Sequence, residues 1–91
     1  MHKQGRREPG ADEILDVRGK CCPEPALEAR RRLDVMAAGR VLKIIATDPL
    51  ATVDLQILCD RLGHRLLESR TNGDELSVWI RVSAERRPGA G

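Results

Sequence analysis

The chain has 91 residues, of which 33% are charged and 41% hydrophobic, and a single tryptophan is its only aromatic residue. This length allows one small domain, whose core must be built from aliphatic side chains. Lys and Arg number 16 against 14 Asp and Glu, so the net charge is only +2. Charges of both signs alternate along the sequence, which argues against direct binding of nucleic acid.

Both ends of the chain are predicted to be flexible tails around one folded domain. Residues 1–12 and 84–91 are rich in Gly, Pro and Arg, and without apolar periodicity neither can bury enough surface to offset its ordering entropy. The N-terminal stretch lacks the apolar core of a signal peptide, and no later segment is long enough to span a membrane. We therefore expect a cytoplasmic protein that does not bind membranes, with its domain at residues 13–83 and its cysteines as thiols.

Between the tails, the strand period and the helix period alternate. The predicted elements, in chain order, are a strand at 14–17, a helix at 23–37, a strand at 41–47, a helix from 48 to about 62, and strands at 64–70 and 75–82. Asp48-Pro49 is expected to begin the second helix and Gly63 to end it, because a carboxylate caps a helix and proline suits its first turn. Asn72-Gly73 is typical of a tight hairpin with positive φ angles. The resulting order is βαβαββ.

The last predicted strand determines the architecture. Its aliphatic residues alternate with Ser77, Trp79, Arg81 and Ser83, so one face of the sheet should be packed and the other, with Trp79, mostly exposed to water. Right-handed strand–helix–strand crossovers would place both helices on the packed face. We therefore predict an α+β fold, a two-layer α/β sandwich with two helices on one face of a four-stranded mixed sheet.

The run Cys22-Pro23-Glu24-Pro25 is the most informative motif of the chain. Proline costs little in the first turn of a helix, where backbone N–H groups have no helical acceptor, so Pro23 is predicted as the first helical residue and Cys22 as its cap. The unpaired N–H groups and the helix dipole would then favour the thiolate of Cys22. The carboxylate of Glu24 would raise the pKa of the same thiol, so the sign of the net shift stays open. The motif favours a nucleophilic sulfur over a small packing residue.

Other candidate residues carry weaker predictions. Arg18 could hold its guanidinium near the sulfur or, as we favour, tie down its own loop through Asp16. Cys21 is expected to be a bystander thiol, because neighbouring cysteines make a strained disulfide. Cys59 falls on an aliphatic helical stripe and is expected in the core, and His64 is expected to position the chain after the second helix. No metal site is predicted, because the adjacent cysteines lack the usual spacer and no cluster of histidines accompanies them.

A resemblance to a known family rests on several features that occur together. They are Leu15-Asp16-x-Arg18-Gly19, the motif at residues 22–25, Asp48-Pro49 and His64. In these features the chain resembles the TusA/SirA-like family of sulfur-carrier proteins, over nearly all of residues 14–83. The resemblance implies the two-layer fold predicted above, which is similar to the C-terminal domain of translation initiation factor 3. It also implies a sulfurtransferase-type persulfide carrier rather than a turnover enzyme.

The resemblance further implies partners and a site. Cys22 would accept sulfane sulfur as a persulfide from a cysteine desulfurase or a rhodanese and pass it to a downstream acceptor protein. The pathways implied are tRNA thiolation, molybdenum-cofactor synthesis or sulfur oxidation, and no cofactor is implied for the carrier itself. The residues expected to support the thiol are Pro23, Glu24, Pro25, Arg18 and Asp16.

Two other functions stay open. A thiol redox protein would need a resolving cysteine, but Pro25 stands where the second cysteine of a Cys-x-x-Cys motif would be. A non-catalytic regulatory or protein-binding module would leave Cys22 as an incidental thiol. For a carrier, Val53 and Ile57 on the second helix are predicted to dock a donor or acceptor protein, and Trp79 to support self-association or a second contact.

Overall fold

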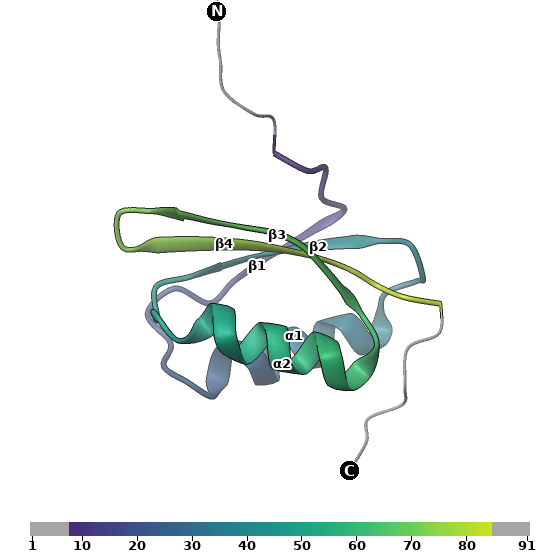
Figure 1. Ribbon diagram of the computed structural model, residues 1–91, viewed down its shortest axis with the longest axis horizontal. Helices are drawn as coiled ribbons and strands as arrows, with labels where there is room; N and C mark the ends of the chain where they lie inside the picture. The colour runs from purple at the N-terminus through teal and green to yellow at the C-terminus, as the bar shows by residue number, and fades with distance from the viewer. Residues whose placement is uncertain (1–7, 85–91) are drawn as a thin grey trace, which may run out of the picture.

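The computed structural model describes residues 8–84, which form a sheet and a layer of two helices (Figure 1). The elements are β1 (Glu13–Asp16), α1 (Glu24–Val35), β2 (Val41–Ala46), α2 (Ala51–Leu62), β3 (Arg65–Asn72) and β4 (Glu75–Arg81). Their order confirms the predicted βαβαββ arrangement. Of the predicted flexible tails, residues 1–7 and 85–91 lie outside the described residues. No helix within the described range is long and apolar enough to cross a membrane.

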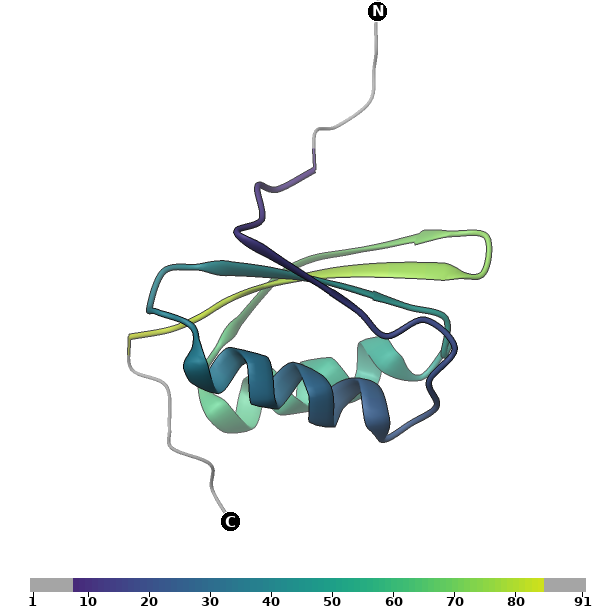
Figure 2. The same cartoon turned by 180° about the vertical axis from the view of Figure 1, so that it is seen from behind.

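The sheet is mixed, with the strand order β1-β2-β4-β3. β1 runs parallel to β2, and β4 is antiparallel to both of its neighbours. α1 connects β1 to β2, and α2 connects β2 to β3 past the intervening strand β4. The two opposite views agree that both helices lie side by side on one face of the sheet (Figure 1 and Figure 2). This arrangement confirms the predicted two-layer sandwich.

The core between the two layers is aliphatic. Residues of the helices recur with the helix period, and residues of β2 and β4 recur with the strand period, so each element turns one apolar face inward. Buried members of this cluster are Ala29, Leu33, Met36, Leu42, Ile44, Ala51, Leu55, Cys59, Val78 and Ile80. Gly63 ends α2, as predicted, with a left-handed φ of +84° and its N–H donating to the carbonyl of Cys59.

The face of the sheet away from the helices is less open than strand alternation predicted. Trp79 lies on that face, yet only 1% of its surface is exposed. The ammonium of Lys43 and the guanidinium of Arg70 lie over the indole ring, 5.2 and 5.6 Å from its centre. Glu8 and Glu68 form ion pairs with these two cations. The prediction of an exposed Trp79, and with it the basis for self-association through this residue, is therefore wrong.

The β3–β4 hairpin lies where it was predicted, but its turn differs. Asn72 pairs with Glu75 as the last pair of the ladder, which leaves Gly73 and Asp74 as a two-residue loop. In this turn only Gly73 has a positive φ, at +65°. This is the pattern of a hairpin turn with glycine at its first central position. The expectation that Asn72 also supplies a positive φ is wrong, because Asn72 belongs to the strand.

Candidate functional site

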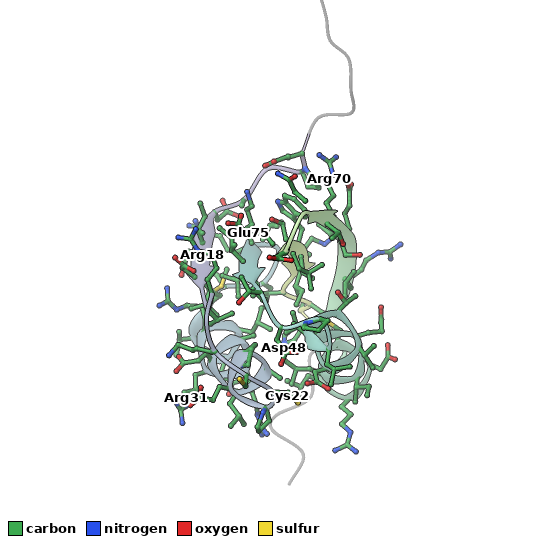
Figure 3. All side chains as sticks on the ribbon, turned by 90° about the vertical axis from the view of Figure 1, so that its left-hand side faces the viewer. Arg18, Cys22, Arg31, Asp48, Arg70 and Glu75 are labelled. Carbon is green, nitrogen blue, oxygen red and sulfur yellow. The ribbon has the colours of Figure 1, made fainter. Side chains whose placement is uncertain are left out.

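Cys22 lies in the loop between β1 and α1, and its side chain is exposed. Figure 3 shows it near the helical layer, below Asp48, whereas Arg18 and Glu75 lie higher, at the level of the sheet. The loop therefore presents the sulfur at one end of the two helices. Such exposure allows the thiol to react with groups on other molecules.

The start of α1 differs from the prediction by one residue. Pro23 occupies the cap position, Glu24 is the first helical residue, Pro25 lies in the first turn, and the peptide bond between Cys22 and Pro23 is cis. The two prolines have no N–H, and the N–H of Glu24 donates to the carbonyl of Cys21 at 2.8 Å. Cys22 is therefore not the helix cap, and the first turn of α1 offers its sulfur fewer N–H groups than predicted.

Asp48, in the loop between β2 and α2, holds the loop that carries Cys22. Its Oδ1 accepts a hydrogen bond from the N–H of Leu50 at 2.9 Å, and its Oδ2 accepts one from the N–H of Cys22 at 2.5 Å. Because α2 begins at Ala51 with Leu50 in the cap position, the prediction that Asp48 caps this helix is wrong. The side chain instead forms an Asx turn that leads into α2.

A carboxylate that the sequence did not indicate contacts the sulfur. Sγ of Cys22 lies 2.6 Å from Oδ2 of Asp54, which belongs to the first turn of α2. A carboxylate only accepts hydrogen bonds, so the thiol is the donor. This hydrogen bond is the largest cause of a raised pKa of Cys22, and desolvation and the negative charges of Asp54 and Asp48 raise it further. The sequence left the sign of the net pKa shift open; in the structure the pKa of Cys22 is raised, and the carboxylate chiefly responsible is Asp54 rather than Glu24.

Arg18 is engaged within its own loop and on the sheet. Its Nε and Nη2 donate to the two carboxylate oxygens of Asp16 at 2.9 and 2.7 Å, and its backbone N–H donates to Oδ1 at 3.0 Å. Nη1 lies 3.3 Å from a carboxylate oxygen of Glu75 in β4. The hydrogen bonds from Arg18 lower the pKa of Asp16 to about 2. Arg18 and Asp16 thus tie the β1–α1 loop to the start of β4.

The remaining candidates lie at different depths. Cys21 is exposed, next to the motif thiol. Cys59, on α2, is buried in the core of the protein, as predicted, and burial raises the pKa of its thiol to about 12. His64 is also buried, and its Nδ1 accepts a hydrogen bond from the N–H of Ser83 at 3.3 Å. His64 therefore connects the start of β3 with the chain after β4.

A groove of about 250 Å³ lies between α1 and α2 and opens beside Cys22. Its lining combines the thiol with apolar and charged side chains of both helices, among them Ala26, Arg30, Asp54, Ile57, Leu58 and Arg61. Val53 and Ile57, which were predicted to point away from the core, are exposed by 56% and 48%. The sulfur is therefore bordered by a surface that another protein can contact.

The sheet, the two helices and the exposed thiol before the first helix define a small two-layer α/β protein that presents a cysteine at one end of its helical layer. The fold is similar to the crystal structure of a SirA-like protein from Desulfitobacterium hafniense, with a TM-score of 0.69 at 22% sequence identity. The match covers 78% of this chain and 97% of the other. At this level of identity the likeness establishes the shared fold.

Comparison of sequences identifies the family. The family model of sulfurtransferase TusA matches residues 13–82. The chain is 40% identical over 74 residues to the sulfur carrier protein TusA of Pseudomonas putida, a match that covers 81% of this chain and 92% of that protein. It is 39% identical to the sulfur carrier protein TusA of Pseudomonas aeruginosa, over 81% and 94% of the two chains. The chain therefore belongs to the TusA family.

Proposed function

We propose that this protein is a sulfur carrier that holds sulfane sulfur as a persulfide on Cys22 and relays it between two other proteins. Its Pseudomonas relatives are sulfur carrier proteins, and it belongs to the same family. The observation that carries the proposal is the exposed Sγ of Cys22, held in a short loop beside the groove between α1 and α2. Of the other two thiols, Cys59 is buried, which leaves it out of reach of a partner.

The chemistry of the proposed relay is thiol–persulfide exchange. In loading, Sγ of Cys22 loses its proton and attacks the terminal sulfur of a donor persulfide. A new S–S bond forms at Cys22, the S–S bond of the donor breaks, and the electron pair leaves with the donor thiolate, which takes up a proton. Unloading is the same exchange, with an acceptor thiolate as the nucleophile. Because the sulfane sulfur only changes its bonding partner, the relay needs no external oxidant.

An exposed loop suits a carrier because a donor and an acceptor must approach the same atom in turn. The proposed supporting residues keep this loop in one conformation while leaving the sulfur open to solvent. They are Pro23, Glu24 and Pro25 at the start of α1, and the ion pair between Arg18 and Asp16.

The partners that we propose are proteins. A cysteine desulfurase or a rhodanese would be the donor, and the acceptor would be a protein thiol in tRNA thiolation, molybdenum-cofactor synthesis or sulfur oxidation. Val53 and Ile57, here called the α2 docking face, are exposed apolar side chains on the helix that also lines the groove beside Cys22. Apolar side chains next to a reacting atom are suitable anchors for such transient contacts.

Mass spectrometry of the intact protein tests the proposal. Incubation with a cysteine desulfurase, its pyridoxal phosphate cofactor and free cysteine should add the mass of one sulfur atom. Cys22→Ser should abolish this addition, whereas the matched variant Cys21→Ser should keep most of it. Equal loss in both variants would contradict Cys22 as the carrier residue. Loss of two hydrogens would instead indicate a redox protein, and an unchanged mass a binding module.

A further inference from the structure

The carboxylate of Asp54 is directed at the reacting atom of the proposed carrier. Its Oδ2 lies 2.6 Å from Sγ of Cys22, although the two residues are 32 positions apart in sequence. None of the ion pairs among residues 8–84 includes Asp54. The thiol is therefore the side-chain partner of this carboxylate, and the function of Cys22 as described above gives Asp54 no role.

We propose that Asp54, by accepting a hydrogen bond from Sγ, keeps unloaded Cys22 as a protonated thiol. It thereby favours release of sulfur over its retention. This inference rests on the proposed function of Cys22. The hydrogen bond to Asp54 exists only in the unloaded state, because a persulfide has no hydrogen on Sγ. An interaction made in one of two states shifts the equilibrium toward that state.

Both partners of this hydrogen bond are held in place by hydrogen bonds from their backbone N–H groups. The N–H of Asp54 donates to the carbonyl of Leu50 at 3.1 Å, within the first turn of α2. The carboxylate of Asp48 accepts hydrogen bonds from the N–H of Leu50 at 2.9 Å and from the N–H of Cys22 at 2.5 Å. Asp48 thus ties Cys22 to the same helical turn that carries Asp54. The hydrogen bond of the thiol is therefore preorganised by the fold.

The charges that face the thiol are mixed. Asp54 on α2 and Asp48 in the β2–α2 loop act against the thiolate, as does the neighbouring thiol of Cys21. Two cationic side chains, Arg30 of α1 and Arg61 of α2, line the groove that opens beside the thiol. The net effect is a raised pKa of Cys22, which agrees with a thiol that retains its proton in the resting protein.

The proposed unloading step balances in atoms and charge. The thiolate of an acceptor attacks the terminal sulfur of the Cys22 persulfide, a new S–S bond forms, and the bond between Sγ and that sulfur breaks. The electron pair stays on Sγ, which takes up the proton given up by the acceptor thiol and donates it in a hydrogen bond to Asp54. Loading runs in reverse, so Sγ must give up this hydrogen bond before it attacks a donor. Asp54 therefore slows loading and assists unloading.

The variant Asp54→Asn tests the inference, because it removes the charge and keeps the shape of the side chain. Alkylation of Cys22 by iodoacetamide, followed as a function of pH, should show its inflection at lower pH than in the native protein. The rate at neutral pH should rise about threefold for each unit by which the thiol pKa falls, since the thiolate fraction grows about tenfold while its nucleophilicity declines.

A second measurement reports on the sulfur itself. Native protein and Asp54→Asn are equilibrated with a fixed ratio of glutathione to glutathione persulfide, and the loaded fraction is read by intact mass spectrometry. We expect a severalfold higher ratio of loaded to unloaded protein in the variant. Asp60→Asn, which removes the same charge from α2 where the carboxylate bonds Gln56 at 3.0 Å, should behave like the native protein in both measurements.

The possible outcomes separate the two proposals. A native alkylation profile in Asp54→Asn, or a loaded fraction equal to or below the native one, would overturn the role of Asp54, provided that thermal unfolding is unchanged. If neither protein is loaded by glutathione persulfide or by a desulfurase, the persulfide function itself is contradicted. The pH profile of alkylation then still decides whether Asp54 raises the pKa of Cys22 and so keeps its thiol protonated.

Discussion

The carboxylate of Asp48 accepts a hydrogen bond from the backbone N–H of Cys22 at 2.5 Å, across 26 positions of the sequence. Its other oxygen accepts the N–H of Leu50 at 2.9 Å, so one side chain joins the β1–α1 loop to the turn that begins α2. Asp54 belongs to the first turn of that helix and contacts the sulfur. The position of the thiol therefore depends on two loops, of which the Cys-Pro-Glu-Pro motif supplies only one.

Replacement of Asp48 should loosen the site and lower stability. Asp48→Ala removes both acceptors and is expected to reduce the free energy of unfolding by about 1–2 kcal/mol, as the loss of a turn or cap acceptor typically does. Asp48→Asn keeps one carbonyl oxygen for the turn and should cost less. Urea unfolding of the three proteins measures the difference. A free energy of unfolding in Asp48→Ala equal to that of the native protein would show that the bridge adds nothing to stability.

The parts of this structure that could be predicted depend on local sequence patterns. The inward faces of α1 and α2, the end of α2 at Gly63 and the hairpin at Gly73 follow from periodicity and from the conformations that glycine allows. The contact between Cys22 and Asp54 depends instead on how the β1–α1 loop packs against the start of α2. No local pattern reports such packing, so the sequence indicated the thiol and missed its carboxylate.

The error at Trp79 has a related physical cause. Strand alternation correctly predicts that Trp79 points away from Val78 and Ile80, which lie in the core. Alternation does not report that Lys43 on β2 and Arg70 on β3 extend over the ring from both neighbouring strands. Long cationic side chains cover apolar surface with their stems. Trp79, on the outer face of the sheet, is thereby about as buried as the residues of the core.

Cys22 and Cys59 should differ in reactivity at neutral pH. Cys22 is exposed and should be alkylated faster than Cys59, which is buried and whose thiol pKa is raised to about 12. Because the pKa of Cys22 is also raised, less of it is thiolate at neutral pH, and it should react more slowly than a cysteine in an unstructured peptide. Its rate should increase as the pH is raised toward that pKa. Residue-resolved mass spectrometry after brief treatment with iodoacetamide checks this order, and a Cys22 faster than the peptide thiol would contradict it.

The environment of Trp79 can be measured directly, because it is the only tryptophan of the chain. Its fluorescence should be blue-shifted and resistant to quenching by iodide in the native protein, and both properties should disappear in urea. Trp79→Ala should lower the free energy of unfolding by about 3–5 kcal/mol, as expected for a large buried aromatic residue. Ready quenching in the native protein would mean that Lys43 and Arg70 leave the ring open.

The α2 docking face should matter for transfer between proteins beyond any effect on the thiol itself. Val53→Asp combined with Ile57→Asp places two charges on exposed apolar positions beside the groove. We expect kcat/KM for sulfur transfer from a cysteine desulfurase to fall at least about tenfold, because anchor residues of an interface typically contribute more than 1 kcal/mol each. The thermal stability should stay unchanged, because both side chains are about half exposed. Since Ile57 lines the groove beside Cys22, a carboxylate placed there also raises the pKa of the thiol, so the rates of transfer are compared after correction for the measured rate of Cys22 alkylation. Val35→Asp is the matched control: it is 80% exposed at the last position of α1, the end of that helix away from Cys22, and should transfer sulfur at the native rate. If a folded double variant transfers sulfur as fast as this control, the donor must dock on Cys22 from another side.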